Sequence, residues 1–190
     1  MLASIHPLGE RARHNRWGLT AAAFAVGAVG AGSMAGATLG WAGSHLSDGT
    51  WRWWAAMGIV VAAGAADLVG VRPIGPRRQV NKDWIGRYRG WVYGVGFGAQ
   101  LGVGVSTFVV TWAVWATASV AVLSGSPMAG ALIGAAFGIG RTVHPLAAGW
   151  IDRPSRLTAF NRRMASWASP VGRIVAVGLL MVGAVGMVVV

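Results

Sequence analysis

Residues 91–141 read WVYGVGFGAQLGVGVSTFVVTWAVWATASVAVLSGSPMAGALIGAAFGIGR, and this stretch decides the fold class of the chain. Its first fifty residues carry no charged side chain, and only Ser-Gly-Ser-Pro at 124–127 interrupts the apolar run. Folded in water, the stretch would leave more apolar surface than a 190-residue chain could cover. In a bilayer it predicts two spanning helices joined by a tight turn. The sequence therefore predicts an integral membrane protein.

The composition agrees with a membrane protein. Hydrophobic residues make up 55% of the chain and charged residues 11%, which is roughly half the charged fraction of a typical soluble domain. There is no cysteine, and this excludes disulfides, thiolate metal sites and thiol redox chemistry. The net charge is +11, but the basic residues lie in short loops beside apolar runs. We therefore expect anionic lipid headgroups on the cytoplasmic side as partners, and no nucleic acid.

The apolar runs predict an all-α fold, a polytopic membrane helical bundle that forms one integral membrane domain over residues 1–190. The first run could instead begin with a cleaved signal peptide, but its apolar character continues past the small residues at 35–37. The third run is too long for one upright span, so its helix either tilts or breaks near its glycines. Pro145 is expected to close the fourth span, and Pro170 to open the last. The five predicted spans are residues 17–46, 51–71, 91–123, 128–144 and 170–190.

Two basic loops, residues 72–90 and 150–169, show the spacing of amphipathic helices. In the second loop, Leu157, Phe160, Met164 and Trp167 recur on one side among arginines. Such a pattern predicts a helix lying in the membrane interface, although the loop at 72–90 could also simply fold back in the cytoplasm. The basic residues expected at lipid headgroups are Arg77, Arg78, Lys82, Arg87, Arg89, Arg153, Arg156, Arg162 and Arg163.

The distribution of charge predicts the orientation. Fifteen of the sixteen basic residues lie in the N-terminal tail, the loop at 72–90 or the region 141–173, and Arg52 alone lies elsewhere. With five spans, these three regions fall on one face of the membrane. The positive-inside rule then places the N-terminus in the cytoplasm and the C-terminus outside. The Ala-, Gly- and Arg-rich composition suggests a bacterial plasma (inner) membrane.

Three sets of glycines recur at every fourth position, and we call them the glycine ladders. This spacing puts each ladder on one helix face, where it allows helix backbones to approach closely. Ordinary helix packing explains the ladders, and a sharper interpretation makes one of them a hinge or the lining of a narrow polar path. The ladders are Gly32-Gly36-Gly40, Gly94-Gly98-Gly102 and Gly130-Gly134-Gly138.

A few polar residues inside the predicted spans are candidates for function. Asp67 lies thirteen residues after Trp54, near which the second span enters the membrane, and Arg141 lies thirteen residues after Met128, near which the fourth span enters. They are therefore expected at similar depth, as an ion pair or as a gate or ion-coupling site. His144 lies one turn beyond Arg141 and has a side chain that titrates near neutral pH. Gln100 lies among the glycines of the third span, where it either bonds another helix or lines a cavity.

Enzyme chemistry is not predicted. The serines and histidines lack the context of an activated nucleophile, and the acids are too few and too scattered for paired-carboxylate catalysis. The glycines at 94, 96 and 98 have no strand–turn–helix context, so they do not indicate a dinucleotide-binding loop. We expect no catalytic residue, no metal and no cofactor.

The segment RRQVNKDWIGRYRGWVYGVGFGAQLGVGVSTFV, residues 77–109, resembles small actinobacterial membrane proteins. Their glycine-rich spans are similar to those of the CcdA/DsbD-like (LysE-type transporter) superfamily, and the resemblance covers residues 77–145. It implies a related helical membrane fold. That family carries electrons on a pair of membrane cysteines that this chain lacks, and it has six spans where five are predicted here. No functional residue transfers by motif.

Two function hypotheses follow. The first is a small transporter-like protein of unknown substrate, with a path near Gln100 and the level of Asp67 and Arg141. The alternative is a non-catalytic membrane scaffold or subunit, which binds a partner protein or a second copy of itself through its glycine-rich helix faces.

Overall fold

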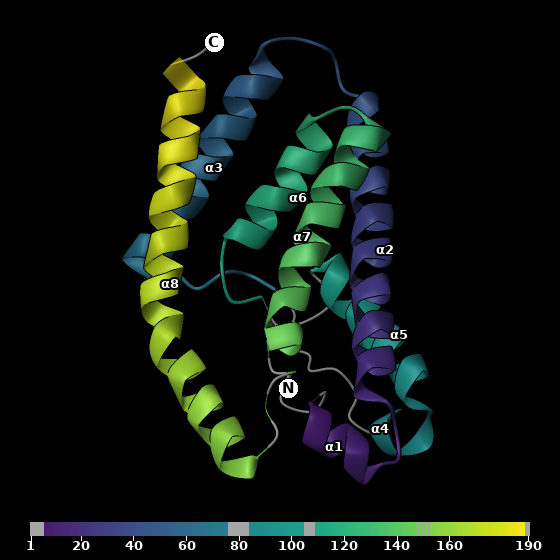
Figure 1. Ribbon diagram of the computed structural model, residues 1–190. Helices are drawn as coiled ribbons and strands as arrows, with labels where there is room; N and C mark the ends of the chain where they lie inside the picture. The colour runs from purple at the N-terminus through teal and green to yellow at the C-terminus, as the bar shows by residue number, and fades with distance from the viewer. Residues whose placement is uncertain are drawn as a thin grey trace.

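The computed structural model describes residues 6–75, 84–104, 109–147, 149, 151 and 153–188, and in this part of the chain all regular structure is helical (Figure 1). α2 is the centre of one group, in which it packs against α5 and α7, while α3 pairs with α8 and α6 lies between the two groups. In chain order the helices are α1 (Pro7–Ala12), α2 (Trp17–Ser44), α3 (Trp51–Val69), α4 (Trp84–Arg87), α5 (Gly90–Val103), α6 (Ala113–Leu123), α7 (Pro127–Ala147) and α8 (Pro154–Val188).

Three of the described helices, α2, α3 and α8, are long and apolar enough to cross a membrane. α2 and α3 match the predicted spans at 17–46 and 51–71 closely. Many large apolar side chains on them are exposed, such as Val26 at 69% and Met34 at 73%. A protein in water would bury such side chains, so these surfaces are compatible with a membrane protein.

The predicted third span is broken into two helices. α5 ends at Val103, and Gly104 follows it with a φ of +77°, which favours glycine. The ring of Phe137 lies 2.9 Å from where a Cβ of Gly104 would stand, so a larger residue does not fit. The chain resumes as α6 at Ala113. With 14 residues, α5 reaches only about 21 Å along its axis, less than the ~30 Å hydrocarbon core of a bilayer.

Two prolines lie inside helices, although Pro145 is predicted to close a span and Pro170 to open one. Pro145 lies within α7, which continues to Ala147, and Pro170 lies within α8. The predicted interfacial helix at 150–169 and the predicted span at 170–190 are therefore largely one continuous helix. A proline removes one backbone hydrogen bond, and the exposed surface around Pro170 leaves the freed carbonyl group of Ser166 open to solvent. In the loop at 72–90, the four-residue α4 is helical and residues 76–83 lie outside the described part.

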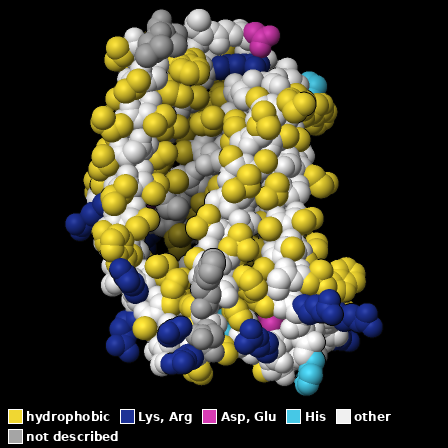
Figure 2. Space-filling model, in the orientation of Figure 1, with side chains coloured by type: hydrophobic (Ala, Val, Ile, Leu, Met, Phe, Trp, Pro, Cys, Tyr) yellow, Lys and Arg dark blue, Asp and Glu magenta, His cyan; other side chains and the backbone are white. Residues whose placement is uncertain are grey.

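α1 and the C-terminal end of α8 lie at opposite ends of the bundle (Figure 1). Lys and Arg side chains gather at the end where α1 lies (Figure 2). Arg52, at the start of α3, lies at the other end, beside the last residues of α2. The segregation of charge seen in the sequence is thus also a segregation in space.

Candidate functional site

The glycine ladders lie where helices of the same chain touch. A Cβ added to Gly36 would overlap the carbonyl oxygen of Gly130, and one added to Gly134 would overlap that of Gly32. α2 and α7 run in opposite directions, so the two ladders pair along their length. Because the glycines have no side chains, the two backbones are in direct contact.

The third ladder packs on another side of α2. Along α5, Gly94 faces Thr20, Gly98 faces Phe24 and Gly102 faces Ala28, so the two helices run parallel. The carbonyl oxygen of Ala28 also lies 2.5 Å from where a Cβ of Gly138 would stand. α2 is therefore held on two sides at once, and all nine ladder glycines face a helix of their own chain.

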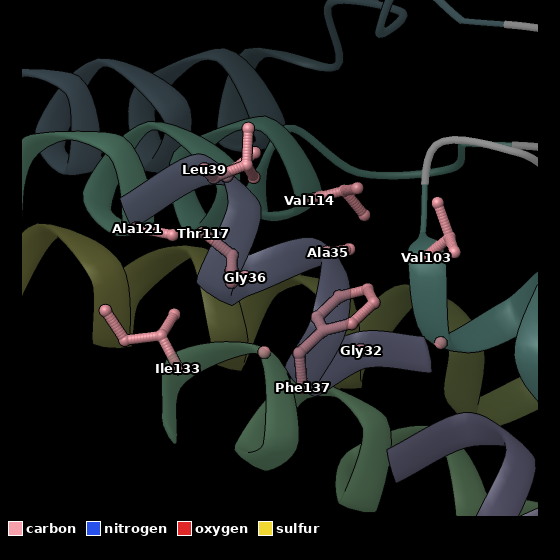
Figure 3. A pocket seen from close by; sticks show the side chains of 13 residues that line it. Gly32, Ala35, Gly36, Leu39, Val103, Val114, Thr117, Ala121, Ile133 and Phe137 are labelled. Atoms are coloured by element: carbon pink, nitrogen blue, oxygen red, sulfur yellow. The ribbon is translucent and has the colours of Figure 1, made fainter. Parts of the chain in front are cut away.

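A small cavity of about 40 Å³ lies between α2, α5, α6 and α7, beside the break after α5 (Figure 3). Its walls are glycines and apolar side chains, among them Val103, Val114 and Phe137. The one hydroxyl group, that of Thr117, donates its hydrogen to the carbonyl oxygen of Ala113 at 2.8 Å. Gln100 is half-buried on α5 and does not line this cavity. The cavity offers no set of polar groups that would hold a hydrated solute.

Asp67 holds the first turn of α6. Its carboxylate accepts a hydrogen bond from the Thr111 hydroxyl at 2.5 Å and another from the Trp112 backbone N–H at 2.9 Å. The residue at the N-terminal boundary of α6 makes no side-chain cap of its own. A carboxylate from α3 thus accepts a hydrogen bond from one backbone N–H at the start of α6 and complements the dipole of that helix.

Asp67 and Arg141 do not form an ion pair, which was one of the two interpretations of these residues. Arg141 lies over the ring of Phe137, with the guanidinium carbon 4.9 Å from the ring centroid. Within the described residues the ion pairs are Glu10–Arg13 and Asp48–Arg52. Counting residues along two spans predicts how deep Asp67 and Arg141 lie in the membrane, but not the direction in which each side chain points. The side chain of His144 lies outside the described part.

Sequence reasoning missed a buried polar cluster at the basic end. Glu10, on α1, is fully buried and forms an ion pair with Arg13 at 2.9 Å. Its carboxylate also accepts hydrogen bonds from the hydroxyl groups of Thr20, at 3.0 Å, and of Tyr93. The amide of Asn15 donates to the Tyr93 oxygen at 3.4 Å. α1 is thereby anchored to α2 and α5. The available signal was one acid in an otherwise basic tail.

Arg52, the exception in the charge distribution, closes the C-terminal end of α2. Its guanidinium donates to the carbonyl oxygens of Gly43 at 3.1 Å, of Ser47 at 3.0 Å and of Leu46. A cation at these carbonyl groups also complements the negative end of the helix dipole. Gly125, in the turn between α6 and α7, has a φ of +59°, and a side chain there would overlap this guanidinium.

The basic residues predicted at lipid headgroups fall into two sets. Arg77, Arg78 and Lys82 lie outside the described residues. Each of the other six is exposed, and they are Arg87, Arg89, Arg153, Arg156, Arg162 and Arg163. Their exposure leaves them accessible to a membrane surface, and their binding to lipid stays a prediction.

No cluster of three or more His, Asp or Glu side chains that could hold a metal ion occurs in the described ranges. No protein-family model, curated protein or solved structure matches the chain.

Proposed function

We propose that this chain is a multi-pass protein of a bacterial plasma membrane, and that it serves as a non-catalytic scaffold or subunit. The observation that carries this proposal is the tight packing of α5 and α7 around α2. Its backbone is in direct contact with the glycine ladders of α5 and of α7, and the cavity beside these contacts is small and apolar. A helix held on two sides by backbone contacts has little room to move.

The glycine ladders are used inside the chain, so a partner binds another surface. The end that carries the exposed arginines faces the cytoplasm in this proposal, where anionic headgroups attract them. The contacts of Arg52 support this orientation. In the described part of the chain it is the Lys or Arg at the opposite end, and carbonyl groups at and just after the end of α2 already hold its side chain.

Cysteine labelling tests the proposal, because the natural chain has no cysteine to interfere. The variants Ala35→Cys and Thr117→Cys place a thiol in the wall of the cavity. The controls Ser47→Cys and Ser155→Cys place one in exposed loops or helix ends on opposite sides. We expect a membrane-impermeant maleimide to label Ser47→Cys from outside and Ser155→Cys from inside. The cavity thiols should react from neither side.

A transporter-like protein is the second candidate, and the interruption between α5 and α6 favours it. Interrupted spans often line the substrate site of transporters. In that case a path near Gln100 would admit water, and a cavity thiol would react with the maleimide from one side or the other. Such labelling would overturn the scaffold proposal. Reversed labelling of the two controls would overturn the orientation alone.

A further inference from the structure

α8 presents two different faces. One face packs on α3: the carbonyl oxygen of Ala176 lies 2.7 Å from where a Cβ of Gly64 would stand, and the side chain of Val61 lies 2.5 Å from where a Cβ of Gly183 would stand. Ala176 and Gly183 are the buried residues of this helix. α3 covers only the C-terminal part of α8, which extends well past the end of α3 (Figure 1).

The opposite face carries an apolar stripe with the spacing of a coiled coil. Starting at Leu157, alternate steps of three and four residues reach Val188, and every residue on this path is a large apolar one except Gly178. We call this path the α8 seam. Along it Trp167 is 50% exposed, Ile174 is 67% exposed and Met181 is 62% exposed. Steps of three and four give the 3.5-residue repeat that two supercoiled helices require.

We propose that the α8 seam binds the seam of a second copy of this chain, as a parallel, two-fold symmetric helix pair. This inference rests on the membrane placement of the proposed function, because two copies inserted in one bilayer have the same orientation. A two-fold axis along the membrane normal then brings each seam residue to the same height as its counterpart.

The course of the seam favours a second copy over lipid as its partner. Residues 170–188 are long enough to cross the hydrocarbon core, so the seam before Pro170 lies outside it. Lipid tails would cover the seam within the core and leave Met164 and Trp167 in water. A second α8 would cover the seam both within the core and before Pro170, and neither helix would have to bend. Other positions before Pro170, such as Ser166 and Arg162, are polar, so the stripe there is distinct.

The size and the charges of the seam suit a helix pair. It extends about 48 Å, and a contact strip roughly 10 Å wide on each copy gives about 1,000 Å² in total, which is the lower limit for a specific interface. Arg156 and Arg163 directly precede seam residues. In a parallel pair they lie opposite Asn161 and Ala168 of the second copy, so no arginine faces an arginine. Gly178, with no atom within 4 Å of its Cβ position, allows close approach near the middle of the core.

Disulfide cross-linking in membranes tests the proposal with single-cysteine variants. Met164→Cys and Met181→Cys place thiols on the seam, one on each side of Pro170. Ser166→Cys is the matched control, two residues from Met164, exposed and off the seam. After mild oxidation, we expect both seam variants to give disulfide-linked dimers at least about fivefold more efficiently than the control. Equal yields from Met164→Cys and Ser166→Cys, or a dimer from Met181→Cys alone, would overturn the continuous seam.

A second variant separates loss of the dimer from loss of the fold. Gly178→Leu adds a bulky side chain where the chain itself has open space, so the thermal midpoint in detergent should be unchanged. The cross-linking of Met181→Cys should fall severalfold in this background. Undiminished cross-linking would contradict the proposal. The two proposals can fail separately. If the cavity thiols react with the maleimide but the dimer forms, only the scaffold function is refuted. If the cavity thiols do not react and no dimer forms, only the pairing of the α8 seam is refuted.

Discussion

Replacing Gly138 by alanine tests the packing around α2 most directly. The added methyl carbon would stand 2.5 Å from the carbonyl oxygen of Ala28, and 2.9 Å from the Ala28 carbonyl carbon and from the Val29 Cα. Ordinary contacts between carbon and oxygen are about 3.3 Å or longer, so α2 and α7 must separate by roughly 0.8 Å at this point. All three obstructing atoms belong to the backbone, and no side chain can rotate away.

The expected cost follows from this displacement. A radial gap of that size forfeits a quarter to a half of the dispersion energy of each separated atom pair. Overpacking of this kind costs about 1–3 kcal/mol, and the rigid surroundings of Gly138 place it near the upper limit. We therefore expect Gly138→Ala to lower the free energy of unfolding by about 2–3 kcal/mol.

The matched control lies two residues further along the same helix. A Cβ at Gly140 meets no atom within 4 Å. Gly140→Ala should therefore show only the gain in helix propensity, about 0.5–1 kcal/mol. The two variants should differ by about 3 kcal/mol, which is roughly a hundredfold in the unfolding equilibrium constant. Reversible denaturation in detergent, followed by tryptophan fluorescence, measures this difference. If the two variants are equally stable, close backbone contact does not hold α2 and α7 together.

Three further predictions concern the polar anchors. Glu10→Ala leaves the buried Tyr93 hydroxyl without its acceptor, so we expect a loss of about 1–3 kcal/mol and faster hydrogen exchange in α1; unchanged exchange would mean that α1 is held by other contacts. Asp67→Ala removes the cap of α6 and should lower the free energy of unfolding by about 1 kcal/mol. In a double-mutant cycle, the effects of Asp67→Ala and Arg141→Gln should add to within measurement error. A measurable coupling energy would show instead that the two side chains interact. A lysine at position 52 cannot reach several carbonyl groups at once, so Arg52→Lys should lower the thermal midpoint of unfolding. Gly125→Ala should lower it too. A midpoint like that of the natural chain would contradict the role of Arg52 at the end of α2.

The elements that could be predicted from sequence are those set by local composition. α2 and α3 follow from uninterrupted apolar runs, and their observed bounds differ little from the predicted ones. The break in the third span was one of two predicted outcomes, because a dense set of glycines weakens a helix without fixing where it ends. The prolines at 145 and 170 misled the prediction, since the rule that proline ends a helix ignores how the lost hydrogen bond is compensated by the surroundings.

The polar anchors depend on tertiary placement, which periodicity does not encode. Glu10 meets Tyr93 only because α5 returns to the start of α2, far along the chain. Asp67 and Arg141 each have a partner of their own, which is the start of α6 for Asp67 and the Phe137 ring for Arg141. Equal depth along two helices is a weaker constraint than contact, because the helices can present those positions in different directions.

The central position of α2 also has a consequence for biogenesis. α2 is synthesised before α5 and α7, and the Gly134 that pairs with its Gly32 is made about a hundred residues later. Until then the bare backbone along Gly32, Gly36 and Gly40 has no α7 to cover it. Contacts so distant in sequence form late and slowly. α2 is therefore made long before it is fully packed, and an early stop in translation would release a chain whose central helix lacks α7.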